Sequence, residues 1–383
     1  MSMAQSPIAI ECWALDIPFH VAFQHASATR SATQAIWIEA RGADGSIGLG
    51  EGCPREYVTG ESVATALAFV DQHREQLAAS VHDLASLRDW TSRHRGVIDE
   101  SPAAWCALEL ALLDLFARQS GQPMEAFLGL PPLRGPFVYS AVLGATDAKQ
   151  FAATLACYQH VGMRDFKIKL SGDVGRDRDN LALLRDAGIA PAKVRADANN
   201  LWSDLDTARA YLESLDYAFA ALEAPLRPGQ FTDLASLAQA LDTRIVLDES
   251  ITRVEQLAHL PGSPECWIVN LRVSKMGGLL RTLALAARCR ELGLALIVGA
   301  QVGETSLLTR AALTVVQNTR DVVIAQEGAF GTLLLEADAV QPTLMFGAKG
   351  ELDISAFRLN QMSGFGLAPT KELRNRFLKH SSD

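Results

Sequence analysis

Three acidic residues recur at nearly equal intervals in the middle of this 383-residue chain. They are Asp197, Glu223 and Asp248, separated by 26 and 25 residues, and each ends a short apolar segment. We call them the acidic triad. Carboxylates that lie close together raise one another's pKa unless a cation lies among them. An all-oxygen ligand set of this kind suits Mg²⁺, so the triad predicts one such ion.

Two lysines lie about one strand–helix unit before the triad, within the segment Phe166-Lys-Ile-Lys-Leu170. Side chains alternate between the two faces of a strand, so Lys167 and Lys169 share one face and the apolar residues share the other. The apolar face must pack on helices, which turns both lysines toward the triad. Two alternatives remain at this point: an edge strand with a solvated face for the lysines, and helix N-cap or first-turn roles for the acids.

These residues belong to a region in which eight short apolar segments alternate with mostly helical stretches. The expected strands are 137–142, 166–170, 193–198, 219–223, 244–248, 267–274, 294–299 and 322–325. Alternation of this kind predicts a parallel α/β sheet, and eight units favour a closed (β/α) barrel with its active site at the carboxyl ends of the strands. The alternative is an open doubly wound sheet, which the lack of a glycine-rich phosphate motif after the first strand disfavours.

The flanking regions predict a second, smaller unit. Strand-like segments at 8–15 and 34–40, a turn at 42–46 and helical patterns at 62–79 and 101–119 indicate an α+β capping domain. We therefore expect three parts. These are a capping domain at 1–125, a barrel at 126–340 and a C-terminal segment at 341–383, with a strand-like stretch at 351–357 and a short basic helix, that returns to the capping domain.

Composition narrows the class of partner. The formal net charge is −9 with no basic run, so neither nucleic acid nor an anionic membrane is an expected partner. No apolar run approaches the roughly 20 residues of a membrane span, and the start of the chain does not resemble a signal peptide. The six cysteines are scattered, as is typical of free thiols in a reducing cytoplasm.

The combination of Lys167-x-Lys169 with the acidic triad resembles the enolase superfamily, and in particular its muconate-lactonizing subgroup within the mandelate racemase/muconate lactonizing enzyme family. The similarity extends over nearly the whole chain, through Gly48-Leu-Gly-Glu51, Glu109 to Asp114, Met276-Gly-Gly and Gly364-Phe-Gly-Leu. It implies a modified (β/α)₇β barrel with an α+β N-terminal capping domain. It also implies a homo-oligomer.

The resemblance implies a shared chemical step: removal of the proton next to the carboxylate of a small substrate. The triad would hold one Mg²⁺, with Mn²⁺ as an alternative ion, which stabilises the enediolate. Lys169 would be the base, and Lys167 would lie near the substrate carboxylate. A base lysine must be neutral, and burial with neighbouring positive charge would lower its pKa.

The chain departs from this family pattern in the sixth barrel strand. Related enzymes have a second catalytic lysine there, but the matching residue is Arg272, which stays protonated and is a poor base. We expect Arg272 to act as an electrostatic clamp and Lys169 to be the only base, which suits elimination or cycloisomerisation. A racemase or epimerase using Lys169 and Lys275 is one alternative. A catalytically silent barrel with a binding role is another.

Other residues are expected at the mouth of the barrel. Asn199 and Asn270 share the inward faces of their strands, Gln301 and Glu304 follow the seventh strand, and Glu327 follows the eighth. By the resemblance, Glu304 lies near the metal site, and Glu327 could contact a cationic group. The seventh strand has no histidine of the mandelate racemase subgroup. The Asp-x-Asp that dipeptide epimerases use is absent, so a dipeptide substrate loses support.

Substrate choice in this family is implied to come from capping-domain loops that fold over the barrel. The candidates are the loops 23–30 and 54–60, in which His25, Arg30, Arg55 and Tyr57 could bind a polar or acidic substrate group. A solvated loop is the alternative for each of them.

Overall fold

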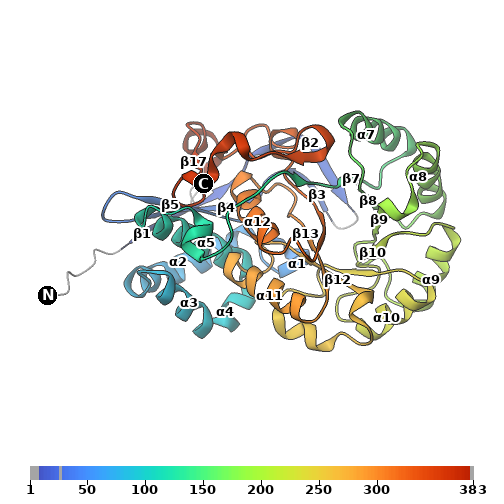
Figure 1. Cartoon of the computed structure of the whole chain (residues 1–383), viewed down its shortest axis with the longest axis horizontal. Helices are drawn as coiled ribbons and strands as arrows, with labels where there is room; N and C mark the ends of the chain where they lie inside the picture. Colours follow the sequence, from blue (N-terminus) through green and yellow to red (C-terminus); the bar gives the residue numbers. More distant parts are fainter. Residues whose placement is uncertain (1–7, 26–27, 380–383) are drawn as a thin grey trace.

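The computed structural model describes residues 8–25 and 28–379. An antiparallel sheet with helices lies beside a barrel of parallel strands, and the segment after the barrel runs back over the sheet (Figure 1). The predicted fold class is confirmed: an α+β domain covers a (β/α) barrel.

The capping domain is built on a four-stranded antiparallel sheet in the order β18-β1-β4-β5. Its strands are β1 (Ala9–Leu15), β4 (Ala35–Arg41), β5 (Ile47–Gly52) and β18 (Leu378–Lys379). Its helices are α1 (Glu56–Thr59), α2 (Val63–Ser80), α3 (Leu84–Arg93), α4 (Arg95–Glu100), α5 (Pro102–Gln119) and α6 (Met124–Leu128). Because β18 pairs with β1, the end of the described chain completes the first domain.

Helix α5 packs against strand β5 with almost no intervening side chains. Gly48, Gly50 and Gly52 turn toward the helix, and a Cβ atom on any of them would lie within about 2 Å of a helix carbonyl oxygen. The helix is buried from Pro102 to Ala117. This backbone-to-backbone contact fixes the sheet at one distance from the helix, and glycine at every second position of β5 is what permits it.

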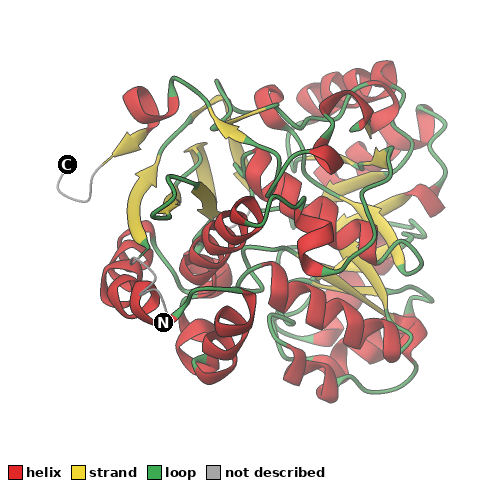
Figure 2. Ribbon diagram, turned by 60° about the vertical axis from the view of Figure 1, so that its left-hand side comes forward, coloured by secondary structure: helices red, strands yellow, loops and turns green. Residues whose placement is uncertain are grey.

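The barrel strands form one parallel sheet in the order in which they occur along the chain. They are β7 (Ala141–Leu143), β8 (Phe166–Lys169), β9 (Val194–Asp197), β10 (Ala221–Glu223), β11 (Ile245–Leu247), β12 (Trp267–Leu271), β13 (Ala295–Val298) and β14 (Val323–Gln326). The outer helices are α7 (Ala148–Val161), α8 (Val174–Asp186), α9 (Leu205–Ser214), α10 (Phe231–Ala240), α11 (Leu279–Glu291) and α12 (Ser306–Asn318). They surround the strands, as Figure 2 shows.

Two connections depart from a regular eight-fold barrel. A 3₁₀ helix, Val254–His259, replaces the α-helix between β11 and β12, and β14 leads into a 3₁₀ turn, Gly331–Leu333, instead of an eighth helix. The ends of the sheet meet at a seam between β7 and β14, where the Ser140 amide donates to the Gln326 carbonyl at 2.8 Å. The arrangement is the modified (β/α)₇β barrel that the family resemblance implied.

Several segments differ from the sequence-based expectation. The sixth strand ends at Leu271, before Arg272, because the backbone turns: the Met276 amide donates to the Arg272 carbonyl at 3.0 Å.

The expected loop at 23–30 belongs to a hairpin of β2 (Pro18–His25) and β3 (Ala28–Ala32), whose backbone groups pair with each other. The stretch at 351–357 is only β16 (Glu351–Leu352) with a 3₁₀ turn, and the C-terminal helix is a π turn, Leu373–Phe377. The short strands β6 (Phe137–Val138), β15 (Val340–Gln341) and β17 (Ala368–Pro369) complete the elements.

Two buried glutamates of the capping domain join it to the barrel. Glu51 accepts from the amide and hydroxyl of Thr305, the N-cap of α12, at 2.9 and 2.5 Å. Glu109 accepts from the Leu280 amide, at the start of α11, at 2.9 Å. Helix N-termini carry partial positive charge and free N–H groups, so each carboxylate caps a barrel helix across the domain boundary.

Among the described residues, the helices are either too short or too polar to span a bilayer.

We expect Gly50→Ala to lower the free energy of unfolding by about 3 kcal/mol, because its Cβ would overlap the Ala107 carbonyl oxygen at 1.9 Å. Urea unfolding measures the change. The matched control is Gly96→Ala in α4, where the new Cβ meets nothing within 4 Å. The control should be neutral or more stable by up to about 1 kcal/mol. Equal effects of the two substitutions would contradict the close packing of α5 on β5.

We expect the stability of the wild type relative to Glu109→Gln to fall between about pH 4.5 and 7. Burial raises the pKa of Glu109 from 4.5 to about 7, so the folded protein holds a proton that the unfolded chain has released. Folding is then disfavoured as pH rises through this window, by on the order of 3 kcal/mol, and the difference is constant above it. Urea unfolding of both proteins from pH 4 to 8 measures the slope, and parallel profiles would count against a buried proton.

Candidate active site

The strand register places the predicted chemical groups in layers inside the barrel. Lys169 is level with Asp197, and Asp197 is level with Glu223, at the carboxyl ends of β8, β9 and β10. One layer deeper, Lys167 is level with Arg195. Parallel strands end at the same rim, so three neighbouring strands deliver these side chains to one place.

The two lysines lie directly among the carboxylates. The Lys167 ammonium is 3.1 Å from Asp197 Oδ2 and 2.6 Å from Glu223 Oε2, and its side chain is 4% exposed. The Lys169 ammonium donates to Asp197 Oδ2 at 3.0 Å and to Asn199 Oδ1 at 2.8 Å. Asn199 thus lies beside the predicted base, at the edge of the triad.

Arg272 lies on the other side of the barrel mouth. Strand β12 is four strands from β8 in the eight-stranded sheet, so the two are opposite each other. The Arg272 guanidinium forms an ion pair with Asp248, lies 3.7 Å from Glu223 Oε1, and donates to Gln301 Oε1 at 3.0 Å. Arg272 therefore bridges two members of the acidic triad across from Lys169.

Lys275 is buried beneath the triad. Its ammonium donates to Asp248 Oδ1 at 2.7 Å and to the carbonyl oxygens of Asp248 and Asn270 at 2.6 and 2.8 Å, and its side chain is 0% exposed. Burial lowers the pKa of Lys275 from its usual value, although Asp248 opposes the shift. All three of its donor hydrogens therefore have acceptors, two on Asp248 just after β11 and one on Asn270 within β12.

The electrostatics of the triad differ between its members. Burial tends to raise the pKa of Asp197, but Lys167 and Lys169 outweigh it and hold the pKa below its usual range. Arg272 and Lys275 likewise outweigh burial and lower the pKa of Asp248. Burial raises the pKa of Glu223 to about 8; Lys167 opposes this rise, and the neighbouring carboxylates add to it. Glu223 is the member whose charge the surrounding cations compensate least.

The donor set fits a divalent cation. Glu223 Oε2 is buried without a hydrogen-bond donor, since Lys167 lies close to it but off the direction of a hydrogen bond, and Glu249 Oε2 is also unpartnered. Within residues 8–25 and 28–379, no three acidic groups converge on one point, because Lys167 and Arg272 bridge the triad in pairs. The unmet demand for positive charge and the all-oxygen chemistry suit Mg²⁺.

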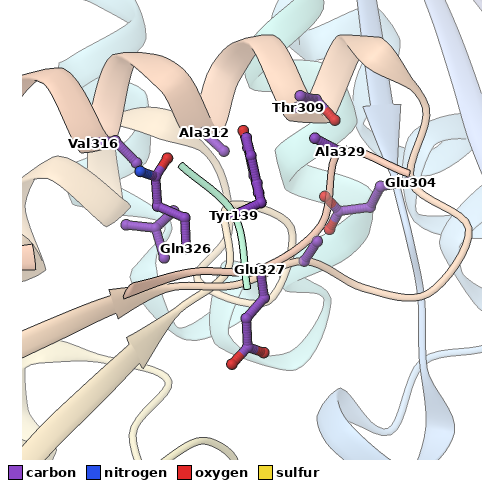
Figure 3. A pocket seen from close by; sticks show the side chains of 10 residues that line it. Tyr139, Glu304, Thr309, Ala312, Val316, Gln326, Glu327 and Ala329 are labelled. Atoms are coloured by element: carbon purple, nitrogen blue, oxygen red, sulfur yellow. The ribbon is translucent and has the colours of Figure 1, made fainter. Parts of the chain in front are cut away.

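Three further polar residues line the mouth. The Asn270 side chain donates to Glu223 Oε1 at 3.0 Å, and the backbone amide of Gln301 donates to Glu304 Oε1 at 2.7 Å. Burial raises the pKa of Glu304 to about 8. Glu304 lines a cavity of ≈ 10 Å³, room for about one water molecule, together with Tyr139. Figure 3 shows the Glu327 carboxylate pointing away from this cavity.

Glu327 faces the barrel interior and is already paired. Its Oε2 accepts from Lys167 at 3.0 Å, and its Oε1 accepts from Arg195 at 3.2 Å. Arg195 also contacts Ser140 and Asp165. The sequence analysis did not single out Arg195, Ser140, Asp165 or Glu249. The alternation of β9, which puts Arg195 on the same face as Asp197, was the one available signal for this group.

The capping-domain candidates lie in different environments. The Arg30 guanidinium stacks 5.7 Å from the centre of the Tyr57 ring, joining the β2–β3 hairpin to α1. Arg55 is 0% exposed and donates to four backbone carbonyls, including Val302 of the barrel at 2.6 Å. The structure therefore places Arg55 in the domain interface. The side chain of His25 lies outside the described part of the chain.

Comparison with known proteins gives consistent matches. The family model described as "Mandelate racemase / muconate lactonizing enzyme, N-terminal domain" matches residues 5–129, and "Enolase C-terminal domain-like" matches residues 150–372. A hydrophobic dipeptide epimerase from Roseobacter litoralis is 30% identical over 276 residues, 71% of this chain and 77% of the relative.

Solved structures share the whole fold. The muconate lactonizing enzyme from Pseudomonas fluorescens, complexed with muconolactone, aligns with a TM-score of 0.84 and 24% identity, over 98% of this chain and 100% of its own. A dipeptide epimerase from Cytophaga hutchinsonii, complexed with Mg and D-Ala-L-Val, aligns with a TM-score of 0.82 and 22% identity, over 98% and 99%.

We expect Mg²⁺ to stabilise the folded protein, by about 2.7 kcal/mol at 100 times its dissociation constant. Glu223→Gln should be more stable than the wild type without Mg²⁺, because folding of the wild type must either add a proton to Glu223 or bury its poorly compensated charge, and glutamine needs neither. The variant should lose the Mg²⁺ effect. Thermal unfolding with and without Mg²⁺ measures both. Glu213→Gln, on the exposed face of α9, is the control and should keep the full effect. An unchanged melting temperature in the wild type would speak against metal binding here.

Proposed function

Since the chain belongs to the mandelate racemase/muconate lactonizing enzyme family of the enolase superfamily, we propose that it removes the α-proton of a small carboxylate substrate. Lys169 is the base in this proposal, and elimination or cycloisomerisation follows. The observation that carries it is the asymmetry of the mouth: an amine lies on β8, and a guanidinium lies opposite it after β12.

The acidic triad would hold Mg²⁺ or, alternatively, Mn²⁺. When bound, the ion supplies positive charge to the substrate carboxylate as its α-carbon loses a proton to give an enediolate. Lys167, whose ammonium lies 2.6 Å from Glu223 Oε2, would face the same carboxylate. Lys169, as the neutral amine, would take the proton, and Asn199 Oδ1 orients its Nζ by accepting the 2.8 Å hydrogen bond.

The groups opposite Lys169 are poor proton acceptors, which favours a mechanism with Lys169 as the single base. Arginine remains protonated at all working pH values, so Arg272 would hold negative charge on the substrate rather than accept a proton. Lys275, the nearest other amine on that side, donates to three oxygens and is fully buried. A reaction that needs a proton moved on one face only, such as elimination or cycloisomerisation, suits this arrangement.

A racemase or epimerase is the second candidate function, because the relative from Roseobacter litoralis is an epimerase. That activity needs a second acid–base group on the opposite face of the substrate. Lys275 would have to leave Asp248 and Asn270 to provide it. Lys169→Ala tests both candidates against a silent binding protein, which would show no turnover to lose.

We expect Lys169→Ala to lower α-proton exchange in D₂O by about 10³-fold, within the usual contribution of a general base. The measurement is NMR of a panel of N-acyl amino acids, dipeptides and dicarboxylates with Mg²⁺. The wild type should exchange one enantiomer only. Arg272→Lys should add slow exchange of the other enantiomer, because it places an amine where the guanidinium lies.

The matched control is Arg290→Lys, a surface arginine paired with Asp321. It should leave the exchange pattern unchanged. Exchange of both enantiomers by the wild type, lost on Lys275→Ala, would refute the one-base mechanism and favour the epimerase.

A further inference from the structure

A continuous column of polar side chains runs through the barrel beside the seam between β7 and β14. It begins at Asp165, just before β8 at the amino-terminal rim, whose side chain is 35% exposed. Ser140 donates to Asp165 Oδ1 at 2.5 Å. Arg195 contacts Asp165 at 3.0 Å, Ser140 at 2.9 Å and Glu327 at 3.2 Å. Glu327 then binds Lys167, which reaches the acidic triad.

The rest of the barrel interior has a different character. Small and branched apolar side chains of β10 to β14 pack together in a separate cluster, made of Ala221, Val246, Ile268, Ile297 and Ala325. Arg195, on β9, is a buried cation, 5% exposed, and its guanidinium reaches Ser140 and Glu327, which lie next to the seam strands β7 and β14. A buried charge destabilises the folded protein unless other groups pair with it, and the three contacts of Arg195 provide this pairing.

We propose that Arg195 is a positioning residue, which holds Glu327 from below and leaves Lys167 free to reach the acidic triad. Glu327 has two oxygens, and each binds one cation. Without Arg195, Lys167 is the only cation in contact with Glu327 and moves toward it, away from Glu223 and Asp197. This inference rests on the proposed function only where it concerns metal binding and the place of Lys167 beside the substrate.

The first test is independent of metal. In EDTA, Arg195→Met leaves Glu327 half-paired and should raise the equilibrium constant for unfolding at least 100-fold. Arg195→Met combined with Glu327→Gln should cost much less than the product of the single effects, because the buried unpaired charge at position 327 is gone and Asp165, 35% exposed, keeps solvent and Ser140 as partners. Additive effects would overturn the proposal. Arg195→Lys keeps a cation near Glu327 and provides a variant that folds if the methionine variant does not.

The second test separates positioning from simple stability. Arg195→Met should tighten Mg²⁺ binding by calorimetry about tenfold, since the triad loses a share of Lys167. The same substitution in a Lys167→Met background should change Mg²⁺ affinity by less than twofold, because the effect acts through Lys167. An equal gain in both backgrounds would mean a direct charge effect and overturn the proposal. Arg195→Lys should return the affinity toward that of the wild type.

The matched structural control is Arg310→Met. Arg310 of α12 is also a fully buried arginine, paired at 2.7 Å with Glu125 of α6 in the capping domain, away from the acidic triad. The Arg310→Met variant should be less stable to unfolding than the wild type, without any change in Mg²⁺ affinity. If the wild type binds no Mg²⁺, the proposed function fails at that step, whereas the EDTA cycle still decides whether Arg195 holds Glu327.

Discussion

The repulsion among buried carboxylates at one rim of the barrel is the constraint on which the rest of the site depends. Asp197 and Glu223 end β9 and β10 at the same level of the sheet, and Asp248 comes directly after the last residue of β11. Carboxylates so close and so buried are stable only beside positive charge. Lys167 and Lys169 supply it from β8, and Arg272 and Lys275 supply it from the turn that follows β12.

The capping domain is held to this rim by contacts that allow little movement. The glycines of β5 set the sheet directly on α5, and Glu51 and Glu109 cap two barrel helices from the same unit. Arg55 adds four hydrogen bonds to backbone carbonyls, one of them in the barrel. The β2–β3 hairpin and α1, which carry Arg30 and Tyr57, are thus attached to a rigid base beside the mouth.

The barrel interior divides into two sides with distinct roles. Apolar residues fill the side below β10 to β14 and give the ordinary packing of a closed barrel. The seam between β7 and β14 has only a sparse backbone connection, and the column from Asp165 to Lys167 crosses this region. One set of ion pairs therefore serves both the closure of the barrel and the charge balance of the mouth.

The sequence by itself predicted the fold class, the eight barrel strands and the grouping of the lysines with the triad, because alternation and strand spacing are local properties. It also predicted Arg272 in place of a lysine, since this is a matter of residue type. It did not predict that β12 ends before Arg272 or that residues 23–25 pair with residues 28–30, because strand alternation does not mark where the backbone turns. Only the tertiary structure placed Arg55 in the domain interface and paired Arg195 with Glu327, because these contacts join groups far apart in the chain whose distances no local pattern encodes.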